Sequence, residues 1–84
     1  MTMNSFITNL KIELAKSNKE KREIEIKIKR CFVELSNYIN PFFKSAKDIK
    51  ADEIEQIGDD LQSLKLVLEK LENRIIELED ELGE

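Results

Sequence analysis

The sequence predicts an all-α protein: an antiparallel, coiled-coil-like two-helix hairpin that dimerises into a four-helix bundle. Three observations predict this fold. Apolar residues recur at alternating steps of three and four in both halves of the chain, which is the spacing of a heptad repeat. A single proline interrupts the chain near its middle. The two halves carry opposite net charge, so they can pair with each other.

The clearest repeat lies in the second half of the chain, where every apolar heptad position is Ile or Leu. We call these residues the second seam: Ile54, Ile57, Leu61, Leu64, Leu68, Leu71, Ile75, Leu78 and Leu82. A helix with one apolar stripe is marginal in water and needs another apolar surface to cover it. We therefore expect a helix over about residues 49–82 that packs on another part of the chain.

The first half repeats this spacing with two polar interruptions, Ser17 and Lys21. We call these residues the first seam: Ile7, Leu10, Leu14, Ser17, Lys21, Ile24, Ile28, Cys31, Leu35 and Tyr38. The stretch has no Gly or Pro and is rich in Lys and Glu, which favours a helix over about residues 5–39. Polar seam residues often fix register or oligomeric state, and we expect that role for Ser17 and Lys21.

Residues 10–30 allow an alternative, a short β-hairpin followed by the long C-terminal helix. Apolar and charged residues alternate with period two over residues 10–14 and 24–28, as in half-buried strands. The connection lacks the glycine-containing turn that such hairpins favour, and a two-stranded hairpin is marginal without support. The helical interpretation is therefore preferred.

A bend is predicted over about residues 40–48, because Pro41 disfavours helix at Asn40. Ser45 and Asp48 have the spacing of a capping box at the start of the second helix. A short bend between two amphipathic helices makes them antiparallel neighbours. We expect one domain over residues 1–84.

Aromatic residues and lysines gather at this bend and form a candidate partner-binding tip: Phe42, Phe43, Lys44 and Lys47. Aromatic side chains are common anchors of protein interfaces. The alternative is that the rings plug the open end of the bundle while the lysines are solvated.

The folded-back geometry predicts which side chains face each other. If the bend centres near residues 44–46, Lys11 faces Glu79 and Glu25 faces Lys65 on one flank. On the other flank, the pairs Glu13–Arg74 and Lys27–Asp60 are expected in one register of the helices but not in a register shifted by half a heptad. Exposed pairs of this kind select orientation more than they stabilise. We also expect the ring of Phe32 to cover Gly58, a glycine that otherwise costs about 1 kcal/mol against alanine in a helix.

Several apolar residues lie off the seams and form a candidate oligomer interface: Ile12, Ile26, Val33, Leu66, Val67 and Ile76. Apolar residues on two faces of a helix indicate a second buried contact, which a bundle of two hairpins would supply. A chain of 84 residues is also marginal as a lone monomer. We expect a homo-oligomer, most simply a dimer.

The net charge of −4 is unevenly distributed, with +5 over residues 1–50 and −9 over residues 51–84. Pairing of the two halves explains this division. The alternative is that the basic first helix binds nucleic acid or nucleotides, through Lys19, Arg22, Lys27, Lys29 and Arg30.

The sequence contains no histidine, one cysteine and no glycine-rich phosphate loop. The usual general base and the commonest metal ligand are therefore missing, and we expect no enzyme, no cofactor and no metal site. Neither a signal-peptide pattern nor a membrane-length apolar run is present, so a cytoplasmic location is expected. The predicted function is protein–protein interaction by a small oligomeric helical protein, as an adaptor, assembly chaperone, regulator or inhibitor.

Overall fold

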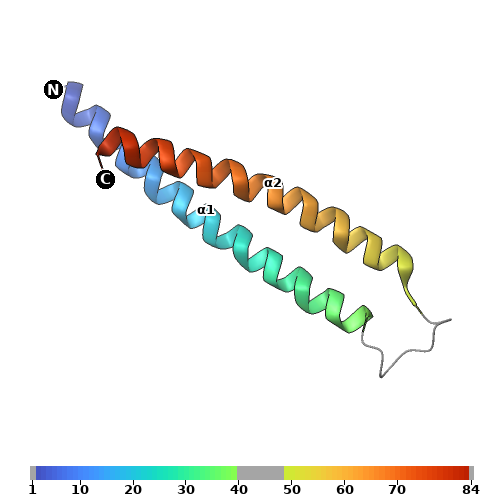
Figure 1. Ribbon diagram of the computed structural model, residues 1–84. Coiled ribbons are helices and arrows are strands. Elements are labelled where there is room, and N and C mark those ends of the chain that lie inside the picture. The colour runs from blue at the N-terminus through green and yellow to red at the C-terminus, as the bar shows by residue number, and fades with distance from the viewer. Residues whose placement is uncertain (1, 40–48, 84) are drawn as a thin grey trace.

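The computed structural model describes residues 2–39 and 49–83, and it places two long α-helices in them. Helix α1 spans Thr2–Tyr38 and helix α2 spans Ala51–Leu82. The helices run antiparallel, with both chain termini at the same end of the molecule (Figure 1). They contact each other extensively. The predicted all-α hairpin is therefore confirmed.

The β-hairpin alternative is wrong, because residues 10–30 lie entirely within α1 and the described residues contain no strand. The segment forms a helix because only the helix lets the rest of the chain cover its apolar side chains. As a helix, this segment places all its seam residues on one face, where α2 covers them. Two isolated strands would leave much of that apolar surface in water.

Helix α1 starts three residues before the expected position and ends at Tyr38. At that end the Ile39 amide donates a hydrogen bond to the Leu35 carbonyl, with an N–O distance of 3.1 Å. The predicted bend at residues 40–48, with its capping-box residues Ser45 and Asp48, lies outside the described residues.

Helix α2 begins at Ala51, two residues later than expected, and its N-cap residue Lys50 makes no side-chain capping bond. Asp52 and Glu53 lie in the first turn, where their negative charges suit the positive end of the helix dipole. At the other end Gly83 adopts a left-handed conformation with φ of 74°, and its amide donates to the Asp80 carbonyl at 3.1 Å. Glycine takes up this terminating conformation without a Cβ clash.

The two seams face each other and form the core. Every residue of the second seam is buried or half-buried, and so is every residue of the first seam except Ile7. Leu78 is completely inaccessible to solvent, and Leu10, Ile57 and Ile75 are nearly so. The heptad spacing therefore identified the contact between the helices.

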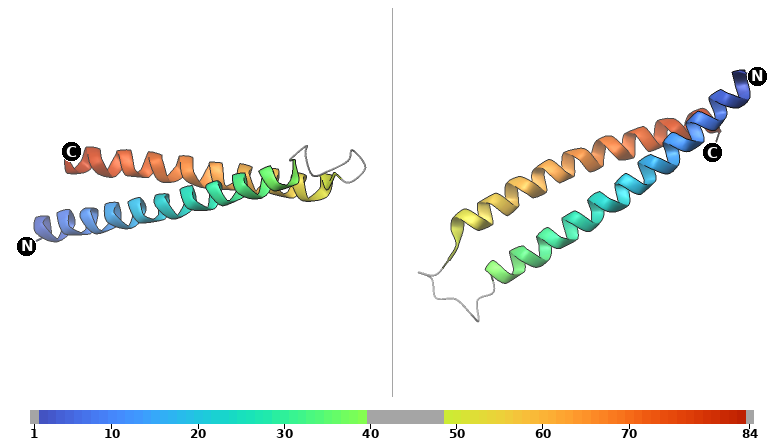
Figure 2. Two further views of the ribbon diagram at one scale, coloured as in Figure 1. Left: turned by 90° about the horizontal axis from the view of Figure 1, so that it is seen from below. Right: turned by 180° about the vertical axis from the view of Figure 1, so that it is seen from behind.

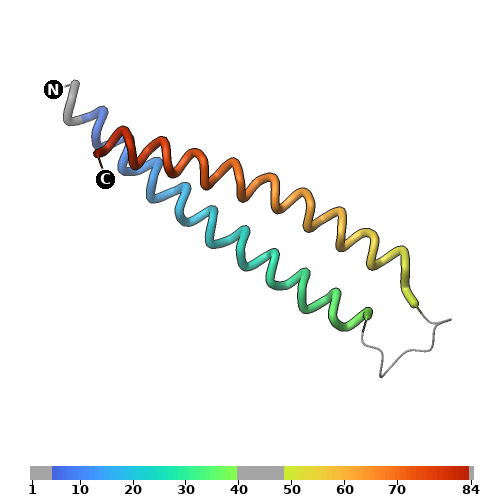
Figure 3. Tube along the Cα trace, in the orientation of Figure 1, coloured from blue at the N-terminus to red at the C-terminus, as the bar shows by residue number. Residues whose placement is uncertain are grey.

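The hairpin is a thin rod of 67 × 16 × 15 Å. In Figure 1 the helices overlap near the chain termini, whereas in the perpendicular view of Figure 2 they overlap near the bend, so they wind around each other. The chain trace in Figure 3 shows the same two-rod arrangement. The radius of gyration of the hairpin is 19.1 Å, whereas a compact domain of this length has a radius of gyration of about 12 Å. Each helix is therefore covered along one side only.

Candidate functional site

One ion pair joins the helices across their flank. The Arg74 guanidinium contacts the carboxylate of Glu13, with Nη2–Oε1 and Nε–Oε1 distances of 2.8 and 2.9 Å. The same guanidinium reaches Glu77 within α2 at 3.0 Å. The predicted Glu13–Arg74 pair is therefore confirmed, and it constrains how far one helix can slide along the other.

Hydrogen bonds to Glu13 and then to Glu77 raise the pKa of Arg74 above its ordinary value. A raised pKa contributes stability that is fully present at lower pH and is lost only as pH rises through the folded-state pKa. Arginine stays protonated in proteins. We therefore expect no loss of this contact through deprotonation of Arg74 under ordinary conditions.

The opposite flank does not form its expected pairs. Within the described part of the chain, neither Lys11–Glu79 nor Glu25–Lys65 is an ion pair, and Lys65 instead lies 4.0 Å from Glu69 on its own helix. These predictions are wrong, because long exposed side chains gain little by leaving water for a pair across the groove.

The remaining cross-helix expectations have mixed outcomes. Lys27 and Asp60 line the same hollow in the groove between the helices, although no ion pair joins them. Phe32 is 56% exposed, and no atom of α1 lies within 4 Å of the position that a Cβ would take on Gly58. The expected cover of Gly58 by Phe32 is wrong, because the ring lies beside the seam and extends into solvent.

All six candidate interface residues are exposed, but they do not form one patch. Ile12, Ile26 and Val33 lie on α1, on the face opposite its seam. Leu66 lies on the corresponding outer face of α2. These faces point away from each other because the seams of the two helices meet in the middle of the hairpin.

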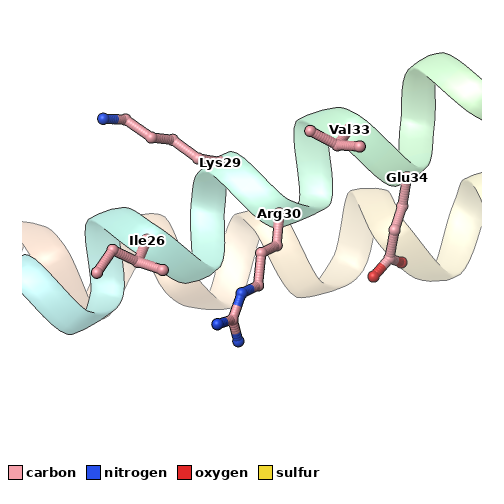
Figure 4. A pocket seen from close by; sticks show the side chains of 5 residues that line it. All are labelled: Ile26, Lys29, Arg30, Val33 and Glu34. Carbon is pink, nitrogen blue, oxygen red and sulfur yellow. The ribbon is translucent and has the colours of Figure 1, made fainter.

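The charged neighbours of these residues follow a pattern. On α1 two of the three heptad positions that face away from the seam form a continuous row of exposed residues, which we call the outer stripe of α1: Ile12, Ala15, Lys19, Arg22, Ile26, Lys29, Val33 and Ser36. It combines aliphatic and basic side chains and has no acidic one. The third position, beside this row, carries both basic residues and Glu23. Figure 4 shows part of this surface, where Ile26, Lys29 and Val33 of the stripe line a shallow, open hollow together with the neighbouring residues Arg30 and Glu34.

The same two heptad positions on α2 give the outer stripe of α2: Glu55, Asp59, Gln62, Leu66, Glu69, Asn73, Ile76 and Asp80. All are exposed, and the row combines aliphatic and acidic side chains with no basic one. Val67 is not part of it and lies on the flank, one heptad before Arg74. Sequence reasoning missed both stripes because it grouped the off-seam apolar residues without the charged residues at the same heptad positions.

The candidate nucleic-acid residues are all exposed but are not brought together on one surface. Lys19, Arg22 and Lys29 belong to the outer stripe of α1. Lys27 lines the groove hollow with Asp60. Arg30 lies between these two regions and lines hollows on both sides.

The predicted tip residues Phe42, Phe43, Lys44 and Lys47 lie outside the described residues. Cys31 is half-buried and lines the groove hollow. In residues 2–39 and 49–83, no three His, Cys, Asp or Glu side chains gather in a way that could hold a metal ion. Neither helix, over its described length, contains an apolar segment that could cross a membrane.

Comparison of the chain with protein-family models, with curated proteins and with solved structures finds no match. Any function assigned to the chain therefore rests on its own residues and geometry.

Proposed function

We propose that this chain is a non-enzymatic helical protein that self-associates and acts through protein–protein interaction, as a cytoplasmic adaptor, assembly chaperone, regulator or inhibitor. One observation carries the proposal: aliphatic side chains at helical spacing stand exposed on the outer faces of both helices. Ile26 is 51% exposed, Val33 62% and Leu66 49%. Rows of this kind, rather than scattered single residues, are typical of interaction surfaces.

The total surface of the hairpin supports self-association. Its accessible area is 6772 Å², whereas a compact monomer of this mass exposes about 5,200 Å². Covering an aliphatic side chain fully contributes about 1.5–3 kcal/mol. Burial of several outer residues therefore supplies enough free energy to hold copies together.

The shape of the surface supports a binding role rather than catalysis. The hollows on the described residues are shallow and open, lined by residues of one helix or of the groove between the helices. Enzyme sites commonly exclude water from the reacting groups, which an open groove on a thin rod does not do. The cytoplasmic part of the proposal is supported by the single unpaired cysteine, since secreted chains of this size commonly rely on disulfides.

Light scattering over a concentration series tests this proposal. We expect a mass above the 9.8 kDa of one chain that increases with concentration. A mass that stays at one chain up to several hundred micromolar would overturn self-association.

A matched pair of variants locates the contact. Ile26→Ala together with Val33→Ala removes aliphatic surface from the outer face of α1, and we expect at least about tenfold weaker association. Val67→Ala is the control, because Val67 is also an exposed helical valine but lies on the flank. Equal weakening by the control would place the contact elsewhere.

Nucleic-acid binding is the second candidate function, favoured by the alignment of Lys19, Arg22 and Lys29 on a stripe without acidic residues. Its affinity would fall steeply with salt, because binding releases counterions from the phosphates. Fluorescence anisotropy with labelled single- and double-stranded oligonucleotides tests it. Absence of binding at about 50 mM salt, where such contacts are strong, would eliminate this candidate.

A further inference from the structure

The two outer stripes are alike in spacing and opposite in charge. The outer stripe of α1 carries Lys19, Arg22 and Lys29 among its aliphatic residues, and the outer stripe of α2 carries four carboxylates. These carboxylates are Glu55, Asp59, Glu69 and Asp80. Both rows run along the exposed side of a helix for most of its length. Each stripe therefore offers an apolar surface with charges that the other can neutralise.

We propose that the outer stripe of α1 on one copy packs against the outer stripe of α2 on a second copy. This inference rests on the proposed self-association and names the two surfaces that meet. The aliphatic residues supply the burial. The charges select the partner, since attractive charge pairs fix which surfaces meet while like-charge contact is costly.

Pairing of like stripes is disfavoured. Two outer stripes of α1 would bring six cationic side chains together, and two outer stripes of α2 would bring together eight anionic ones. Within one copy the stripes cannot meet, because the buried seams of α1 and α2 face each other and the exposed outer stripes lie on the opposite sides of the two helices. The complementary surface must therefore come from another copy.

The contact joins two different surfaces, so it is heterologous and need not close with two copies. Each copy can use both of its stripes, one toward each neighbour. The surface in excess of a compact monomer is about 1,600 Å² per copy, and two contacts of ordinary size bury about 800 Å² each on that copy. The exposed surface is thus large enough for two stripe contacts per copy, and a four-helix dimer is the first step of assembly.

Charge exchange between the stripes tests this arrangement. The first variant carries Lys19→Glu, Arg22→Glu and Lys29→Glu, so both of its stripes are acidic. The second carries Glu55→Lys, Asp59→Lys and Glu69→Lys, so the outer stripe of α2 becomes predominantly basic like that of α1. Circular dichroism checks the helix content of each variant before the mass is measured by light scattering at low salt.

We expect each variant alone to associate at least about tenfold more weakly than the unchanged chain. An equimolar mixture of the two variants should recover association, and added salt should weaken it. Recovery in the mixture also shows that both variants are folded.

Three other results of this experiment would each overturn part of the proposal. Unchanged association of both variants alone would overturn the stripe pairing while leaving self-association intact. Loss in only one variant would mean that only one of the two stripes takes part in association, and it would also overturn the pairing. A failure of the unchanged chain to associate at any concentration would overturn the proposed function itself, and the pairing with it.

Discussion

The inner seams and the outer stripes of this hairpin have the same alternating three-and-four spacing but different chemistry. The second seam is entirely Ile and Leu, whereas the first is aliphatic except at Ser17, Lys21, Cys31 and Tyr38. The two seams meet within one chain and leave Leu78 without any contact with solvent. The stripes mix aliphatic residues with charges of a single sign, and they face away from the hairpin. The same helical period therefore builds two kinds of surface.

The difference shows how composition divides the tasks of folding and recognition. A uniform Ile/Leu seam gains the most from burial, so it drives the chain to fold back on itself. A stripe in which Lys or Glu separates the aliphatic residues is stable in water when uncovered. It can still add burial when a surface of opposite charge approaches. Substitutions at seam and stripe positions test whether folding and recognition are divided in this way.

The largest effect is expected when the seam is truncated. Leu78→Ala removes side-chain atoms that are entirely shielded from solvent, and we expect the free energy of unfolding to fall by about 2–5 kcal/mol. Leu66→Ala makes the same chemical change on the outer stripe, where the expected change in the dilute hairpin is within about 0.5 kcal/mol. Urea unfolding followed by circular dichroism measures both, and similar losses would contradict the division of tasks.

A smaller gain is expected when the seam is completed. Lys21 is a half-buried interruption of the first seam, and Lys21→Leu should raise the free energy of unfolding by about 1–2 kcal/mol through added burial. Lys19→Leu, on the exposed outer stripe two residues earlier, is the control and should leave the dilute hairpin nearly unchanged. Thermal unfolding at low concentration measures the two variants. A gain from Lys19→Leu as large as that from Lys21→Leu would mean that both positions are covered in one chain.

Gly58 provides a third comparison. A methyl group at this position would meet no atom of α1 within 4 Å, so Gly58→Ala should raise the free energy of unfolding by about 1 kcal/mol through helix propensity alone. Chemical denaturation at low protein concentration measures the gain. A loss of stability would show that a close neighbour, such as Phe32, does pack on the glycine.

The smallest effect is expected at the Glu13–Arg74 pair, which lies at the exposed margin of the seam. A double-mutant cycle with Glu13→Gln and Arg74→Gln isolates their coupling, which should be favourable at low salt and should vanish at high salt. Coupling between Lys65 and Glu69 serves as the control, because that pair lies within one helix and does not join the two. A large, salt-independent coupling would mean that the pair contributes more than alignment of the helices.

The two helices and the contact between them could be predicted from the sequence, because an apolar residue at each seam position indicates a side chain that must be buried. The contact follows from the uninterrupted Ile/Leu row in α2 and its imperfect counterpart in α1. Aligning these two rows also gave the Glu13–Arg74 pair. The placement of Phe32 could not be predicted in this way, because a side chain beside the seam can turn toward its partner helix or into water at similar free energy.

The candidate site was only partly accessible to the same reasoning. The apolar residues Ile26, Val33 and Leu66 were identified as off the seams. Their division between two opposite faces depends on how the helices are turned, which the hairpin determines. The sequence gives the charges at the outer heptad positions directly. Their use for pairing between copies can be argued only once the structure shows that the two outer faces point in opposite directions.

Small-angle scattering of a dilution series shows whether one chain folds back on itself, because it gives the mass and the radius of gyration together. At concentrations where the mass is that of one chain, we predict a radius of gyration near 19.1 Å, with most of the chain helical. One continuous helix of the same chain would be about 126 Å long and would have a radius of gyration of about 36 Å. A single-chain value near that figure would contradict the meeting of the two seams within one molecule.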